Sequence, residues 1–381
     1  MAPSYAWKYL PPLGQREEAT IDTLYQNYSL RFVPATQSPA WVTTGNYGAP
    51  AENLIYFQRP IASDFYFRDA IAHWVPSAER IKFYNTRIPM TLVGYSFGGG
   101  KEVGQDVLSV DFSGNANART QVDVMLDYLY SKGSYNYQAM KDLTWGFSGS
   151  YTGDRYQFQG FFYHFNLLNK ENGGITDDLY ITNPAEIQGG STSVNYKTIP
   201  TRLSASHNRN VGARLLLNNK YSLGFYKDVE TEDSIISEFV PVTSFTWTLD
   251  YASARHTFRN TNAAQDADFW STRFLSTDGT NDKSSYWSLR NTLGVSLLEG
   301  FNKYAKAGLS VFLTHEFRSY TQPLDTLDRS IPLPDGLTEL PFSPFKQKAN
   351  QNLLYVGAQL VRSQGKILNY SATGELGLVG E

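Results

Sequence analysis

Large apolar and small polar side chains alternate along many segments of the sequence, and this alternation restricts the chain to β-strands. A period of two places successive side chains on opposite faces of a strand, whereas a helix repeats every 3.6 residues. The clearest segment is 243–251, where four large side chains alternate with four polar ones. The large set is Phe245, Trp247, Leu249 and Tyr251, and the polar set is Ser244, Thr246, Thr248 and Asp250. Each such strand meets an apolar environment on one face and a polar one on the other.

The alternation recurs often enough to predict roughly eleven strands, each close to or above the ~9–11 residues of a tilted membrane strand. One of them, 211–226, keeps its phase through the polar Asn218-Asn219-Lys220 and is therefore interpreted as a single long strand. The predicted strands are 89–97, 107–114, 121–130, 143–151, 155–168, 211–226, 243–251, 285–298, 302–318, 349–362 and 366–380.

Connections between these strands alternate in length, as in bacterial membrane barrels with short periplasmic turns and long extracellular loops. The short connections are 114–119, 152–154, 299–301 and 364–366. The longer ones are 98–106, 131–141, 169–206, 257–283 and 319–348. An acidic connection of middling length, 227–240, falls on the periplasmic side by parity. A soluble sandwich gives no reason for this regularity.

Composition agrees with a chain whose rings are spread singly along strands. Aromatic residues make up 15% of the sequence, yet the mean hydropathy is −0.38 and no apolar run approaches the ~18 residues of a membrane helix. We therefore predict an all-β fold, a transmembrane antiparallel up-and-down β-barrel. Single-chain bacterial barrels have even strand numbers, so about eleven strands, a terminal LGLVGE and an N-terminus without a signal peptide predict an incomplete barrel.

The charge balance and the absence of cysteine restrict the partners. A formal net charge of −3 and a pI near 6.0 argue against nucleic acid as a partner, because nucleic-acid-binding domains are usually strongly basic. The chain contains no Cys, which is compatible with export. We expect no cofactor and no metal.

Charged side chains on the polar face of the predicted strands are candidates for the lining of a lumen. Both signs occur, which predicts mixed acidic and basic walls rather than a strongly ion-selective filter. Because a slip of one residue moves every side chain to the other face, the assignment depends on strand phase. The candidates are Asp123, Asp127, Arg214, Asp250, Arg290, Lys306 and Glu316.

Two motifs suggest other chemistry. Gly94-Tyr95-Ser96-Phe97-Gly98 matches the G-x-S-x-G elbow of hydrolases, but that elbow needs a following helix, and the continuation predicts a loop and then a strand. Oxygen-bearing residues at 171–178 could hold Ca²⁺ on a turn, but they lack EF-hand spacing, and an ordered loop near the lumen is the preferred interpretation. The five histidines have no spacing typical of a metal site.

Several long strings resemble the putative porins of Bacteroidetes, and the resemblance spans nearly the whole chain. The matching segments are 45–60 (GNYGAPAENLIYFQRP), 82–89, 153–158, 171–184, 223–228, 240–245 and 296–309. The resemblance implies a Gram-negative outer-membrane barrel, exported with a signal peptide and longer than this chain. It also implies that residues 1–86 form a pre-barrel region, periplasmic or plug-like, and that 87–381 form part of the barrel.

These observations favour a porin-like channel for the passive diffusion of small hydrophilic solutes, with outer-membrane lipid around it and no enzymatic activity. The alternative is a plugged barrel that serves as a binding, scaffold or secretion-associated protein. An outer-membrane enzyme that uses Ser96 is a third hypothesis. Association with further copies of the chain stays open.

Overall fold

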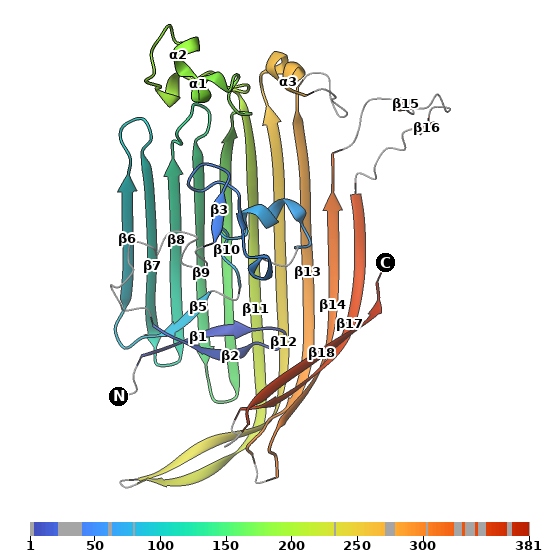
Figure 1. The fold of residues 1–381 in the computed structure, drawn as a ribbon. Coiled ribbons are helices and arrows are strands. Elements are labelled where there is room, and N and C mark those ends of the chain that lie inside the picture. Colours follow the sequence, from blue (N-terminus) through green and yellow to red (C-terminus); the bar gives the residue numbers. More distant parts are fainter. Residues whose placement is uncertain are drawn as a thin grey trace.

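One large antiparallel sheet forms most of the protein (Figure 1). The computed structural model describes residues 4–21, 40–59, 63–78, 81–231, 234–270, 279–301, 304–323, 330–331, 340–341, 348–363 and 368–380. Eleven strands pair in the order of the sequence, so each neighbour runs up and then down. They are β6 (Met90–Gly98), β7 (Gln105–Asn117), β8 (Thr120–Ser131), β9 (Met140–Thr152), β10 (Tyr156–Glu171), β11 (Ser206–Thr231), β12 (Ser234–Asn260), β13 (Asn281–Leu297), β14 (Gly308–Thr321), β17 (Lys348–Arg362) and β18 (Tyr370–Val379).

This sheet confirms the predicted all-β, up-and-down architecture and its eleven strands. Among the described strands, β6 and β18 each have one neighbour in the sheet, which is therefore not closed. None of the helices in the described ranges has the length and apolar composition that a membrane-spanning helix requires.

Two predicted boundaries are wrong. Residues 227–240 are not a loop: β11 and β12 continue through most of them as a hairpin, with Lys227 opposite Glu238. The sequence KDVETEDSIISEFV mixes charged and apolar residues without the regular alternation that made the other strands recognisable. The strand predicted at 302–318 begins instead at Gly308. Gly308 pairs with Val361 of β17, and pairing with β13 begins one residue later, where Leu309 lies opposite Leu297.

The β11–β12 hairpin projects beyond its neighbours. β10 begins opposite Tyr221 and β13 ends opposite Thr243, so the remainder forms a curved two-stranded ribbon (Figure 1). The register shifts at Leu223/Gly224, where the ribbon leaves the sheet. A side chain at Gly224 would meet the Val240 carbonyl oxygen at 2.0 Å, so glycine is needed where this bulge re-aims the strands.

The residues that precede β6 form a separate layer against one face of the sheet. Its regular elements are β1 (Tyr5–Leu10), β2 (Gln15–Ala19), β3 (Trp41–Thr43), β4 (Ala51–Asn53), η3 (Tyr56–Gln58), η4 (Tyr66–Ile71) and β5 (Lys82–Asn85). β2, β1 and β5 make a three-stranded sheet, and β3 pairs with β4. We call the described residues 4–85 the N-terminal layer and the sheet face it covers the inner face.

Short elements cover the end of the sheet opposite the ribbon (Figure 1). Between β10 and β11 lie α1 (Leu179–Thr182), α2 (Pro184–Ile187) and η5 (Tyr196–Thr198), and between β12 and β13 lies α3 (Ala263–Phe269). The two-residue strands β15 (Ser330–Ile331) and β16 (Leu340–Pro341) pair between β14 and β17. Lys197 attaches the β10–β11 connection to the β8–β9 connection, because its ammonium donates to the carbonyls of Gly133 and Tyr135 at 2.8 and 2.9 Å. Burial lowers the pKa of this ammonium.

Candidate functional site

The two faces of the sheet reverse the usual arrangement of a soluble protein. In β9, small and polar side chains such as Thr144 and Ser148 are buried, whereas Trp145 and Phe147 between them are 40% and 53% exposed. Trp247 on β12 is 41% exposed between the buried Thr246 and Thr248. A large exposed apolar surface marks an interaction site or a lipid-facing one. The predicted outward placement of Trp145 and Trp247 is confirmed.

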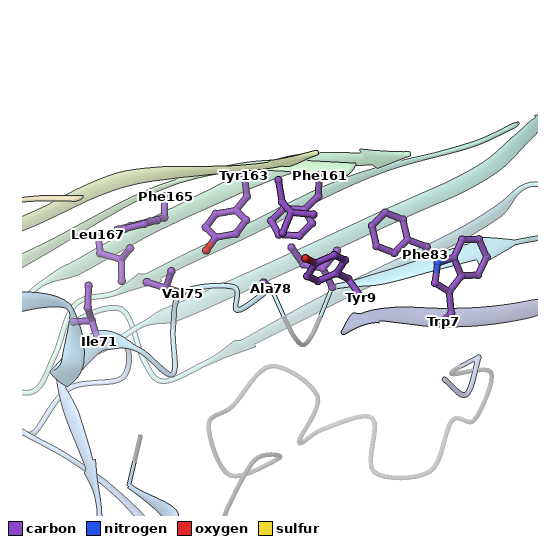
Figure 2. Close-up of a cluster of buried hydrophobic side chains, with 12 residues drawn as sticks. Trp7, Tyr9, Ile71, Val75, Ala78, Phe83, Phe161, Tyr163, Phe165 and Leu167 are labelled. Atoms are coloured by element: carbon purple, nitrogen blue, oxygen red, sulfur yellow. The ribbon is translucent and has the colours of Figure 1, made fainter. Parts of the chain in front are cut away.

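An apolar cluster fixes the N-terminal layer to the inner face (Figure 2). β10 contributes Phe161, Tyr163, Phe165 and Leu167, whose inward positions alternate with outward ones. Figure 2 shows these side chains pointing toward those of the layer. The layer contributes Trp7, Tyr9, Ile71, Val75, Ala78, Ile81 and Phe83. The inner face therefore carries a bound layer rather than bare solvent.

The turn between β1 and β2 extends from this cluster across the polar part of the inner face, which we also call the wall. Gln159 of β10 donates to the Gly14 carbonyl at 2.6 Å, and Gln15 donates to Gln359 of β17 at 2.7 Å. Leu13 lies against Gly294 of β13, and a Cβ added to Gly294 would lie 2.4 Å from the Leu13 side chain. The Tyr9 hydroxyl donates to the Pro12 carbonyl, and burial raises the pKa of this hydroxyl. We call residues 9–16 the tip.

A cavity of about 630 Å³ remains between the layer and the wall beside this tip. Hydroxyl groups of Thr248, Thr292 and Thr373 line it together with charged side chains of both signs. Three cations and three carboxylates contribute, so the formal charge of the lining is zero. They are Arg68, Arg214 and Arg290, with Asp69, Asp250 and Glu375. We call this cavity the passage.

Ion pairs fix the charges on its wall. Arg214 on β11 donates to both carboxylate oxygens of Asp250 on β12, from Nε at 2.9 Å and from Nη2 at 2.6 Å. Arg290 on β13 bonds to Glu375 on β18 at 2.8 Å. The Arg214 pair has side-chain exposures of 27% and 20%, so it is partly desolvated and holds its geometry more firmly than a surface pair.

The seven predicted lining residues lie in four different places. Arg214, Asp250 and Arg290 lie together in the passage. Asp123 and Asp127 line a second inner cavity of about 330 Å³ beside His73 and Trp74. Glu316 is buried on the inner side of β14, where it accepts from Arg318, which also pairs with Asp64 of the layer at 2.9 Å. Lys306 lies outside the strands, exposed in the segment before β14.

Sequence reasoning missed three charged residues of the passage. Glu375 lies opposite in phase to Leu376 and Leu378 on β18, so the same alternation could have identified it. Arg68 and Asp69 belong to η4, and a short 3-10 helix in an irregular layer offers no strand phase to read.

The motifs with other chemistry do not assemble sites. Gly94–Gly98 are the end of β6, and β7 follows rather than the helix of a hydrolase elbow. Glu171 accepts from Asn169 and Asn208, whereas Asp177 accepts from the backbone of Leu179, so the proposed calcium ligands are engaged separately. Within the described ranges, no three His, Cys, Asp or Glu side chains gather as metal ligands would.

The sheet is antiparallel and runs up and down, its outer face is apolar, and its inner face is polar and charged apart from the apolar cluster on β10. These features are those of a porin-like protein. The model of the family described as putative porin matches residues 3–381, and the chain belongs to that family. This confirms the resemblance to putative porins. No curated protein matches the sequence.

Proposed function

We propose that the chain is the wall of a porin-like channel in the outer membrane, through which small hydrophilic solutes diffuse passively. The observation that carries this proposal is the reversed sheet: large rings and aliphatic side chains are exposed on one face, and hydroxyls, amides and ion pairs line the other. Hydrocarbon solvates the first face, and water the second. Outer-membrane lipid and small hydrophilic solutes are then the partners.

The passage is the best-defined part of the route. Solute moves between the N-terminal layer and strands β11–β13, past Arg214, Asp250 and Arg290. Because the wall charges are paired and sum to zero, the channel discriminates weakly between small cations and anions. Pore width and the lining side chains decide which solutes pass, and the tip narrows the lumen on one side.

The second candidate is a plugged barrel that acts as a binding or scaffold protein. It is favoured by one observation, the apolar cluster that joins the N-terminal layer to β10. Residues 1–86 would then form a plug in front of the barrel part of the chain, 87–381, and the passage would be too short to cross the layer.

Single-channel recording of the full-length protein in planar bilayers separates the two. A channel gives discrete conductance steps that scale with salt concentration, together with swelling of proteoliposomes in isosmotic sugar. Protein that inserts in oriented form but gives neither steps nor swelling refutes the channel. Matched detergent without protein is the control for leakage.

A further inference from the structure

A second cavity of about 500 Å³ lies at the other end of the inner face from the ribbon. Its floor is the inner side of β10–β12 near their ends at Asn169, Asn208 and His256, and its roof is formed by β3, β4 and η4 of the layer. These strand ends carry the long connections 172–205 and 261–280. We call this cavity the rim pocket.

Aromatic rings line the rim pocket. Phe67 stacks on His256 with ring centroids 4.2 Å apart and planes 2° from parallel. Tyr66 meets Phe67 edge to face, and its side chain is 81% exposed. An exposed ring face attracts the C–H edge of a ligand through its negative quadrupole, so Tyr66 offers an unused stacking platform.

Amide side chains lie next to these rings on the wall. Asn208 donates to Glu171 at 2.7 Å and meets His256 Nε2 at 3.0 Å, which fixes both side chains. Asn210 lines the same pocket and is half-buried, and no described residue hydrogen-bonds to its side-chain amide. That amide keeps a donor and an acceptor for a ligand that offers both.

The charges of the pocket disfavour an anion. Arg59 is paired with Glu52 at 2.6 Å, and Asp69 accepts from the backbone of Ser63. One cation and two carboxylates therefore line the pocket, and the cation is already neutralised. A phosphate or a carboxylate would face a net negative wall, whereas a neutral hydroxyl-rich molecule would not.

We propose that the rim pocket binds a neutral saccharide of one or two sugar rings. The C–H face of the sugar stacks on Tyr66, and its hydroxyls both donate to and accept from Asn210. The volume falls within the roughly 300–1,000 Å³ of small-molecule sites. Binding here does not depend on conduction, so this proposal and the channel can succeed or fail separately.

The test is a fluorescence titration of the full-length protein in an amine-oxide detergent, because detergents with sugar headgroups would compete. Trp41 lines the pocket and reports occupancy. Maltose and cellobiose are the probes, glucose 6-phosphate is the anionic comparison, and glycerol is the control for viscosity. A saturable change with at least one disaccharide is expected, and weaker binding of glucose 6-phosphate.

Tyr66→Ala and Asn210→Ala should each weaken that binding by roughly two- to tenfold, the effect of losing one contact or hydrogen bond. The matched controls are Tyr226→Ala on the ribbon and Asn219→Ala, which is on β11 but faces outward. Absence of saturable binding by the parent overturns the proposal, as does unchanged binding in both pocket variants. Tighter binding of glucose 6-phosphate overturns the neutral class of ligand.

Discussion

Replacing Asp250 with asparagine should convert the passage from a neutral wall into an anion-preferring one. The asparagine side chain retains an oxygen that accepts a hydrogen bond from Arg214. The substitution therefore keeps the fold and this hydrogen bond but removes one negative charge. The lining then has three cations and two carboxylates, and Arg214 is no longer neutralised.

The size of the effect follows from Coulomb's law. An ion that passes about 5 Å from the lost charge changes its energy by about 0.8 kcal/mol in a water-like dielectric. Screening at ~0.1 M salt reduces this to about 0.5 kcal/mol. The change has opposite signs for K⁺ and Cl⁻, so the permeability ratio of chloride to potassium should rise by roughly fivefold.

The assay is the reversal potential of single channels in a KCl gradient near 0.1 M. Asp228→Asn is the control, because it makes the same change in net charge on the exposed part of β11 that leaves the sheet. Glu375→Gln should shift the potential in the same direction as Asp250→Asn. If Asp250→Asn and Asp228→Asn give the same reversal potential, ions do not pass Asp250 and the assignment of the passage is wrong.

Three further variants test the layer and the rim. Trp7→Ala removes a side chain that is 3% exposed and stacks on Phe83. The loss of about 3–5 kcal/mol of packing free energy should make residues 4–21 accessible to protease and increase conductance. Unchanged cleavage would contradict the anchoring role of Trp7. Gly14→Ala should also loosen the tip, because Gly14 has φ +72° and an added Cβ would lie 2.3 Å from the Asn218 side chain. Faster hydrogen exchange at residues 9–16 would show this loosening, and Gly100→Ala, whose added Cβ meets no atom within 4 Å, should leave exchange unaltered. Lys197→Met removes two charge-assisted bonds and should make the 172–205 connection more sensitive to protease, whereas Lys227→Met on the ribbon should not.

The strands could be predicted because two solvents act on opposite faces of the sheet. Trp247 and Thr248 differ strongly in polarity, so an error of one residue in the predicted strand phase would have placed an apolar and a polar side chain on the wrong faces. Where only water surrounds a strand, as at Lys227 and Glu238, alternation disappears and the polar run resembles a loop. The opposite error occurs at Ala305 and Lys306, which were predicted to lie in a strand. They continue the alternation of β14 but precede its first paired residue, Gly308.

The charged wall was partly predictable for the same reason, and the layer was not. Arg214, Asp250 and Arg290 could be placed because each belongs to a strand with a clear phase. Phe67 and Asp69 lie in a 3-10 helix whose place against the wall depends on contacts with residues 100 or more positions later, such as His256. No local period encodes such contacts.

The bond between Gln15 and Gln359 joins residues 344 positions apart, which has a consequence for the order of folding. Segments near the N-terminus leave the ribosome first, yet the surface that receives the tip exists only once β10–β17 have paired. Contacts of such long sequence separation form late, because the entropy of closing so large a loop must be overcome first. The tip is therefore synthesised before the strands that receive it, yet it is among the last parts of the protein to reach its native position.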